Sequence, residues 1–179
     1  PQNTRSYELG ADISFFNNLV SINYTYSRQN VKDQIFEVPL ASSTGSSSFM
    51  TNGGKIHTNA HELTVNINPI RLKNVDWNIG INWSKIDNYV DELAPGVESI
   101  FLGGFTTPQV RAGIGDKFPV IYGVSYARDD NGNLIVDEDG VPMAGKDDVI
   151  GKVSPDFILG FNTNLRLWKF NISAVFDWK

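Results

Sequence analysis

Apolar and polar residues alternate strictly in six stretches of the chain, a pattern typical of β-strands with one apolar face. The stretches cover residues 6–15, 20–27, 62–68, 75–84, 157–166 and 170–178. In the fourth, for example, the apolar positions are Val75, Trp77, Ile79, Ile81 and Trp83. A stretch of roughly ten residues has the length that a tilted strand needs to cross a membrane. Helical periodicity is nearly absent, and Ile86, Tyr89, Val90 and Leu93 predict one short helical turn.

The connections between these stretches alternate between short and long. Turn signals at Asn17 and Asn18, at 70–74 and at 168–169 join three pairs of strands. The other connections are a Ser/Thr/Gly-rich stretch at 39–54 and the long segment 87–154. The low-complexity part of the first, at 42–48, is expected to be a mobile loop tip. Short turns at one end and long loops at the other are typical of an outer-membrane β-barrel. A soluble β-sandwich, serving as a binding or adhesion module, would also alternate, and it remains the alternative.

The chemistry of the two faces favours the barrel. Between the apolar positions lie mainly Asn, Ser and Gly, which suit a hydrated lumen better than the Lys-, Glu- and Thr-rich solvent face of a soluble sheet. On the apolar face, aromatic residues gather near the strand ends, as in the girdles of membrane barrels. They are Tyr7, Tyr26, Trp77, Phe157, Trp168 and Trp178. We therefore expect an all-β, antiparallel transmembrane β-barrel segment of about six strands.

Composition narrows the function classes further. The 179 residues are 41% hydrophobic and 20% charged, which is too apolar for a disordered chain. Without cysteine there can be no disulfide, thiol nucleophile or thiolate metal site. A net charge of -5 argues against a nucleic-acid partner. Since the chain starts at Pro1 and stops at Lys179 inside a patterned stretch, we expect it to be a piece of a longer protein.

Candidate metal and catalytic groups are few. Asp129 to Asn133 and Asp137 to Gly140 are similar to a calcium loop, but Gly132 stands fourth where a helix–loop–helix site needs glycine at the sixth position. Two acidic turns flanking a short strand at 134–136 explain the pattern without metal. His57 and His61 would lie about 13 Å apart on a strand, too far to share an ion. We therefore predict no metal, no cofactor, no catalytic residue and no enzymatic activity.

Several motifs resemble those of a known family. Two stretches are similar to barrel strands of TonB-dependent receptors. The first is T-R-S-Y-E-L-G at 4–10 with the turn at 16–18, and the second is N-G-G-K-I at 52–56 leading to H-E-L at 61–63. Other motifs resemble the SusC/RagA branch of these receptors: I-G-K-V-S-P-D-F at 150–157, G-F at 160–161 and F-D-W-K at 176–179. So do segments of the long loop at 119–123, 128–132 and 139–142. The succession covers nearly the whole chain, with one departure at Ala60, where the family usually has glycine.

This resemblance implies more than the periodicity does. Such proteins are 22-stranded outer-membrane barrels with an N-terminal plug, and they import glycans or peptides with energy coupled through TonB. A SusD-like surface lipoprotein covers the extracellular mouth. Residues 1–179 would then belong to a single barrel domain, with the plug and the TonB box lying outside this chain. The implied partners are that lipoprotein, the TonB complex, an oligosaccharide or peptide substrate, and membrane lipid.

The long loops are where ligand or lid contacts are expected, because loops on a rigid scaffold carry binding function. Four aromatic residues, Phe101, Phe105, Tyr122 and Tyr126, could stack on sugar rings, with Asp129 or Asp130 accepting hydrogen bonds from hydroxyl groups. Alternatively, these side chains pack the loops together. The substrate-binding residues therefore stay unassigned. A β-rich hydrolase is a third and weaker hypothesis, because no acid pair can be identified from sequence.

Overall fold

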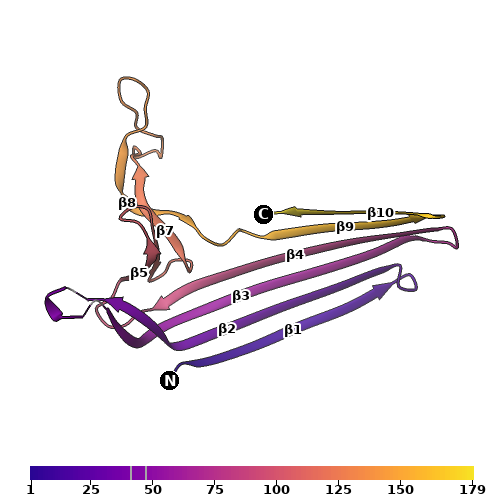
Figure 1. Ribbon diagram of the computed structural model, residues 1–179, viewed down its shortest axis with the longest axis horizontal. Coiled ribbons are helices and arrows are strands. Elements are labelled where there is room, and N and C mark those ends of the chain that lie inside the picture. The colour runs from indigo at the N-terminus through magenta and orange to yellow at the C-terminus, as the bar shows by residue number, and fades with distance from the viewer. Residues whose placement is uncertain (41, 47) are drawn as a thin grey trace. The chain divides into compact units, whose positions relative to one another are not determined.

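The computed structural model describes residues 1–40, 42–46 and 48–179, and that part of the chain is built of antiparallel β-sheet. One sheet has the order β1-β2-β3-β4-β9-β10 (Figure 1). Its strands are β1 (Asn3–Phe15), β2 (Val20–Pro39), β3 (Ser48–Arg71), β4 (Val75–Glu92), β9 (Ile158–Leu167) and β10 (Phe170–Trp178). The prediction of an all-β, antiparallel segment is confirmed, and the six strands by themselves do not close a barrel.

A second sheet has the order β5-β6-β7-β8. Its strands are β5 (Ser99–Gly104), β6 (Gln109–Gly113), β7 (Val120–Tyr126) and β8 (Ala144–Lys152). A 3₁₀ helix, η1 (Ser42–Thr44), lies in the connection between β2 and β3.

The chain divides into two compact units. The strand unit comprises Arg5–Asn30, Thr58–Asp87 and Pro155–Lys179. The loop unit comprises Pro1–Thr4, Val31–His57 and Asn88–Ser154. Because β2, β3 and β4 are long, each contributes residues to both units.

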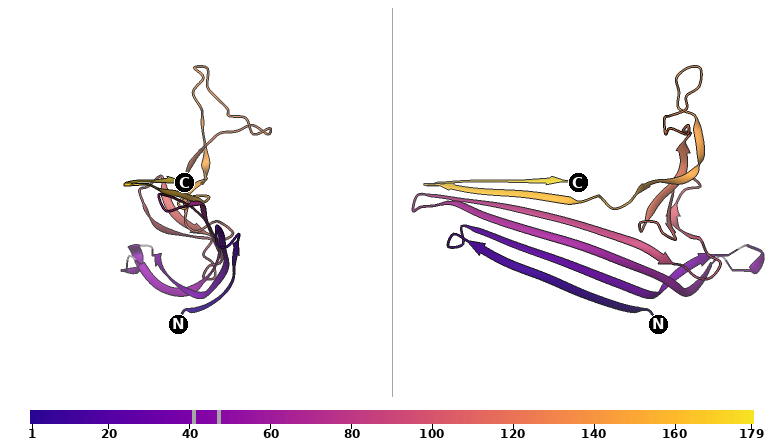
Figure 2. Two further views of the ribbon diagram at one scale, coloured as in Figure 1. Left: turned by 90° about the vertical axis from the view of Figure 1, so that its right-hand side faces the viewer. Right: turned by 180° about the vertical axis from the view of Figure 1, so that it is seen from behind.

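The three predicted hairpin turns are present, and they lie at one end of the strand unit (Figure 2). The first turn places Phe16, Asn17 and Asn18 at φ of 53°, 54° and 65°, and Leu19 N donates to Phe16 O over 3.2 Å. Asparagine tolerates this left-handed region better than most residues, which explains the pair of asparagines there. Trp168 takes the same conformation, with φ of 55°, between β9 and β10.

One prediction about the connections is wrong, and two of the long connections contain strand that the alternation did not predict. The expected helical turn around Ile86 and Val90 does not form, because β4 continues as a strand to Glu92. The long connection 87–154 contains four strands, β5 to β8, that the alternation did not predict. In the predicted loop 39–54, β3 already begins at Ser48, while Ala41 and Ser47 lie outside the described residues.

The hydrophobic core lies in the loop unit. Val90 and Ala112 have no exposed surface and Ile100 is 1% exposed, and around them the structure buries Phe36, Ile56 and Leu93. Among the described residues, every buried apolar side chain belongs to the loop unit. The strand unit therefore has an apolar face but no core of its own.

Candidate functional site

The apolar face of the strand unit is continuous across β4, β9 and β10. The register places Ile81 beside Phe161 and Phe161 beside Phe176, so that large apolar side chains form rows across three strands. Parallel rows consist of Val75, Leu167 and Phe170, then Trp77, Leu165 and Ile172, and finally Trp83, Leu159 and Trp178.

This face is exposed rather than packed into an interior. Leu9 is 74% exposed and Ile172 is 58% exposed, and neither Ile22 nor Ile79 is buried. A soluble sandwich would bury these four side chains in one closed core, and the strand unit, all of whose residues are described, contains no such core. An exposed apolar surface of this extent marks a contact with lipid or with another protein surface.

Aromatic side chains on this face carry polar groups that find partners nearby. Tyr24 Oη lies 2.8 Å from His61 Nδ1, and the Tyr26 ring centroid is 5.0 Å from that of His61. Tyr26 Oη donates to Asn59 Oδ1 over 3.2 Å. Trp77 Nε1 donates across the sheet to Thr163 Oγ1 over 2.9 Å. Rings with an apolar body and a satisfied polar tip suit the boundary between hydrocarbon and water.

The opposite face of the strand unit is polar. Its cross-strand pairs include Asn78 with Asn164 and Gly80 with Asn162. A Cβ at Gly80 would lie 2.5 Å from Asn162 Nδ2, so glycine there makes room for the asparagine side chain. Asn23 also donates to Asp12 across β1 and β2. This arrangement agrees with the predicted hydrated face.

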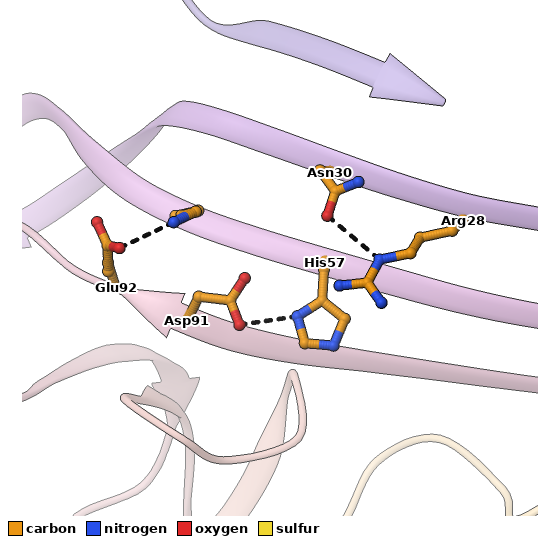
Figure 3. Close-up of polar contacts among 6 residues, drawn as sticks. Arg28, Asn30, His57, Asp91 and Glu92 are labelled. Carbon is orange, nitrogen blue, oxygen red and sulfur yellow. Dashed lines mark hydrogen bonds and ion pairs between the residues drawn. The ribbon is translucent and has the colours of Figure 1, made fainter. Parts of the chain in front are cut away.

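The two histidines, predicted not to share a metal ion, have separate partners. His57 Nδ1 lies 2.8 Å from Asp91 Oδ1 (Figure 3). The His57 ring stacks on that of Tyr89, with 5.2 Å between the ring centroids. His61 instead contacts the two tyrosines described above. Among the described residues, no three His, Asp or Glu side chains gather in a way that could hold a metal ion.

A second pair joins β3 to β4 near His57. Lys55 Nζ donates to Glu92 Oε1 over 2.9 Å, and this hydrogen bond, followed by the charge of Glu92, raises the pKa of Lys55. The His57–Asp91 and Lys55–Glu92 contacts lie on parts of β3 and β4 outside the alternating stretches 62–68 and 75–84. Sequence reasoning missed them because β3 and β4 extend further than the alternation indicated.

The four aromatic candidates of the long segment fall into two groups. Arg111 lies over the Tyr122 ring at 4.5 Å, so Tyr122 packs within the loop unit. Phe105 is 82% exposed and Tyr126 is 63% exposed, while Phe101 is 42% exposed on β5. The structure therefore leaves Phe105 and Tyr126 available to a ligand.

Tyr126 lines a groove along β7 and β8 with a volume of about 860 Å³. Val124 and Ile150 contribute apolar surface, while Lys146 and Asp148 contribute charge. The groove has the mixed lining that a polar solute with apolar patches requires.

The two acidic turns are built alike. Asp129 Oδ1 accepts hydrogen bonds from the backbone N of Asn131 and Asn133, and Asp137 Oδ1 accepts from those of Asp139 and Val141. The side-chain amide of Asn133 also donates to Asp129 Oδ2 over 3.1 Å. The hydrogen bonds to Asp129 lower its pKa, and the one from the Asn133 side chain has the largest effect. The carboxylates thus close their own turns, which accounts for the calcium-like pattern.

Backbone hydrogen bonds join the segments on either side of these turns in a cycle. Ala127 N donates to Met143 O, Met143 N to Ile135 O and Ile135 N to Ala127 O, each over 2.9 Å. We call residues 127–143 the acidic knob. It exposes five apolar side chains beside its acids, those of Leu134, Ile135, Val136, Val141 and Met143. The repeated Asp-x-x-Gly at an eight-residue interval was the sequence signal for this fold.

The sequence is similar to those of two TonB-dependent receptors over nearly its whole length. TonB-dependent receptor P3 of Formosa agariphila is 26% identical over 201 residues, which cover 98% of this chain, and TonB-dependent receptor P26 of the same organism is 27% identical over 203 residues. No protein-family model matches the chain.

Solved structures share its fold. The RagAB peptide transporter matches with a TM-score of 0.79 at 18% identity over 98% of this chain, and the RagAB peptide importer in the open-open state matches with a TM-score of 0.74. The resemblance to a SusC/RagA-type segment is confirmed. The chain spans about a fifth of the length of the curated relatives and solved chains that it matches. In its described part, no helix is long and apolar enough to cross a membrane.

Proposed function

We propose that this chain forms a sector of the wall of a bacterial outer-membrane transporter. One observation carries the proposal: the strand unit exposes rows of large apolar side chains on one face and amides on the other, with no core of its own. A sheet can cross lipid only when every backbone group is paired, so the remaining strands would come from the rest of a longer protein. The plug and the TonB box would also lie outside these 179 residues.

The loop asymmetry supports an orientation. In bacterial barrels the short turns face the periplasm and the long connections face outward. The loop unit, with its groove and its exposed Phe105 and Tyr126, would then meet arriving substrate. We infer that the cargo is a glycan or a peptide, imported with energy supplied through TonB. The names of the relatives and the RagAB peptide transporter support this inference.

The acidic knob suits contact with a lid. Its exposed aliphatic side chains and its carboxylates would fit an apolar depression with a basic rim on a SusD-like lipoprotein. The similarity in fold to the RagAB peptide transporter supports such a pairing. The soluble binding module is less favoured, since the strand unit buries no apolar side chain. We assign no catalytic role to this chain.

The test uses the intact protein in its own bacterium. We expect it in the outer-membrane fraction, extracted only by detergent and shifted in electrophoretic mobility by heating. Deleting it should abolish uptake of at least one labelled oligosaccharide or peptide, and dissipating the proton gradient should have the same effect. A protein recovered as a monomer in plain buffer, or unchanged uptake across both substrate classes, would contradict the proposal.

A further inference from the structure

The turn end of the strand unit concentrates positive charge in a chain that is acidic overall. Segments 69–76 and 165–172 contain four cationic residues and one acid, Asp76, whereas the whole chain carries a net charge of -5. Arg166 Nη2 lies 4.0 Å from Asp76 Oδ2. The other three cations, Arg71, Lys73 and Lys169, have no carboxylate partner among the described residues.

These cations sit on two turns that touch. Trp168 N donates to Asn74 O over 2.7 Å, and the register pairs Val75 with Leu167 immediately beyond both turns. The β3–β4 turn and the β9–β10 turn therefore form one contiguous surface. We call it the basic turn surface, made of Arg71, Leu72, Lys73, Trp168, Lys169 and Phe170.

The same surface is strongly apolar. Leu72, Trp168 and Phe170 are each about two-thirds exposed, at 66%, 68% and 67%. Lys169 Nζ lies over the Trp168 ring, 5.3 Å from its centroid. Arg71 continues the alternation of Leu63, Val65 and Ile67, which places it at the end of the apolar face. Long cationic side chains beside aromatic rings are typical of the level where hydrocarbon meets headgroups.

We propose that the basic turn surface binds anionic phospholipid headgroups in the leaflet that the short turns reach. The occupant is a lipid rather than a free phosphate ion, because the cations lie among exposed apolar side chains at the edge of the apolar face. Charge complementarity supports this choice, since anionic lipid attracts clustered Lys and Arg next to a membrane. The inference rests on the proposed membrane placement and adds to it a preference among lipids.

The test places the intact protein in nanodiscs of neutral lipid that contain either brominated phosphatidylcholine or brominated phosphatidylglycerol at equal mole fraction. Bromine near the headgroup quenches tryptophan fluorescence, and subtracting the signal of a Trp168→Phe variant isolates Trp168. We expect Trp168 to be quenched several-fold more by the anionic lipid. The combined variant Arg71→Gln, Lys73→Gln and Lys169→Gln should equalise the two lipids, and so should high salt, which screens exposed charges.

Two control proteins accompany this variant. The first combines Arg71→Lys, Lys73→Arg and Lys169→Arg, which keep the charge. It should keep the preference for the anionic lipid, provided that heat-modified mobility shows a folded protein. The second combines Lys32→Gln, Arg128→Gln and Lys146→Gln, which remove the same amount of charge from the loop unit. It should leave the preference for the anionic lipid unchanged.

The outcomes separate this inference from the proposed function. If Trp168 is quenched equally by both lipids in the native protein, the lipid preference is refuted while the membrane placement stands. If the loop-unit variant removes the preference as fully as the turn variant, a local site is likewise refuted. If neither lipid quenches Trp168, the turns do not reach the bilayer, and both the inference and the proposed membrane placement fail.

Discussion

At the scale of single residues, Asp129 is held by the turn that it closes. Its carboxylate accepts hydrogen bonds from the Asn133 side chain and from the backbone of Asn131 and Asn133, and these lower its pKa. A carboxyl group whose pKa is lowered by folding stabilises the folded form above its ordinary pKa, and it loses this effect as the pH falls through the lowered value.

We therefore expect the backbone amides of Asn131 and Asn133 to lose protection as the pH falls from about 5 to about 2. Hydrogen exchange of a peptide covering 127–135, corrected for intrinsic rates, measures this change. An Asp129→Ala variant should lack the protection throughout the range, and Asp130→Ala should match the native protein. Protection that persists in Asp129→Ala would show that other contacts hold the turn.

Gly54 accommodates an aromatic ring. A Cβ added at this position would overlap the side chain of Phe36, which is buried in the core of the loop unit. Gly54→Ala should therefore displace the ring and destabilise the loop unit by about 1–3 kcal/mol, the usual cost of overpacking.

The measurement for Gly54→Ala is faster hydrogen exchange in peptides from β2 and β3. Gly103→Ala is the matched control, because an added Cβ there meets nothing within 4 Å and should leave exchange unchanged. Equal exchange in the two variants would mean that Phe36 moves aside without cost.

Phe105 is the aromatic candidate with the most exposed side chain. If it stacks on cargo, Phe105→Ala should raise the half-saturating concentration for uptake by about two- to tenfold, the equivalent of one aromatic contact. Tyr122→Ala should instead lower the amount of folded protein, since Tyr122 packs under Arg111. Unchanged uptake by Phe105→Ala would assign Phe105 no part in binding.

Which aromatic residues are free could not be predicted from the sequence. Phe105 and Tyr122 look alike in their sequence surroundings, and only the position of Arg111 on the neighbouring strand separates them. In contrast, the two acidic turns themselves were predicted, because Asp-x-x-Gly is a local signal. Local chemistry could be inferred from the sequence, whereas contacts between strands required the register.

At the scale of elements, the sequence predicted the six long strands and their turns but not their full lengths. On β4 the apolar positions are odd-numbered from Val75 to Trp83, whereas the buried Val90 is even-numbered. The same switch occurs on β3 between Ile56 and Leu63. A strand that changes its apolar face breaks period-two alternation, and on β4 the break imitated a helical spacing. The short strands β5 to β8 were missed because segments of five to nine residues, each with one or two glycines, show little alternation.

A charge on the apolar face of β4 tests whether that face meets lipid. Ile79 lies in the middle of the stretch 75–83, so Ile79→Arg should cost about 2–4 kcal/mol if this position lies near the bilayer midplane. Asn78→Arg adds the same side chain to the polar face and should cost far less.

The fraction of heat-modifiable protein in the outer membrane measures the difference between these two variants. If both assemble equally well, the apolar face does not lie against hydrocarbon.

At the scale of the whole molecule, the six-stranded sheet has two free edges. β1 and β10 each have one neighbour, and the strands between them alternate in direction, so β10 of one copy can pair antiparallel with β1 of another. Such a contact is heterologous and can repeat without closing. Exposed edges of this kind promote association between chains. In the proposed intact barrel, both edges would be covered by other strands of the same protein.

The isolated chain of 179 residues should therefore assemble head to tail in detergent. Because it contains no cysteine, Ala11→Cys on β1 and Ala174→Cys on β10 can report the contact through an oxidised cross-link when the two variants are mixed. Ala60→Cys, on the interior strand β3, should not cross-link. The intact protein carrying Ala11→Cys and Ala174→Cys should stay monomeric, because its own strands cover both edges. A monomeric isolated chain without cross-links would show that β1 and β10 are protected within the fragment itself, and the open sheet would then be the wrong description of its edges.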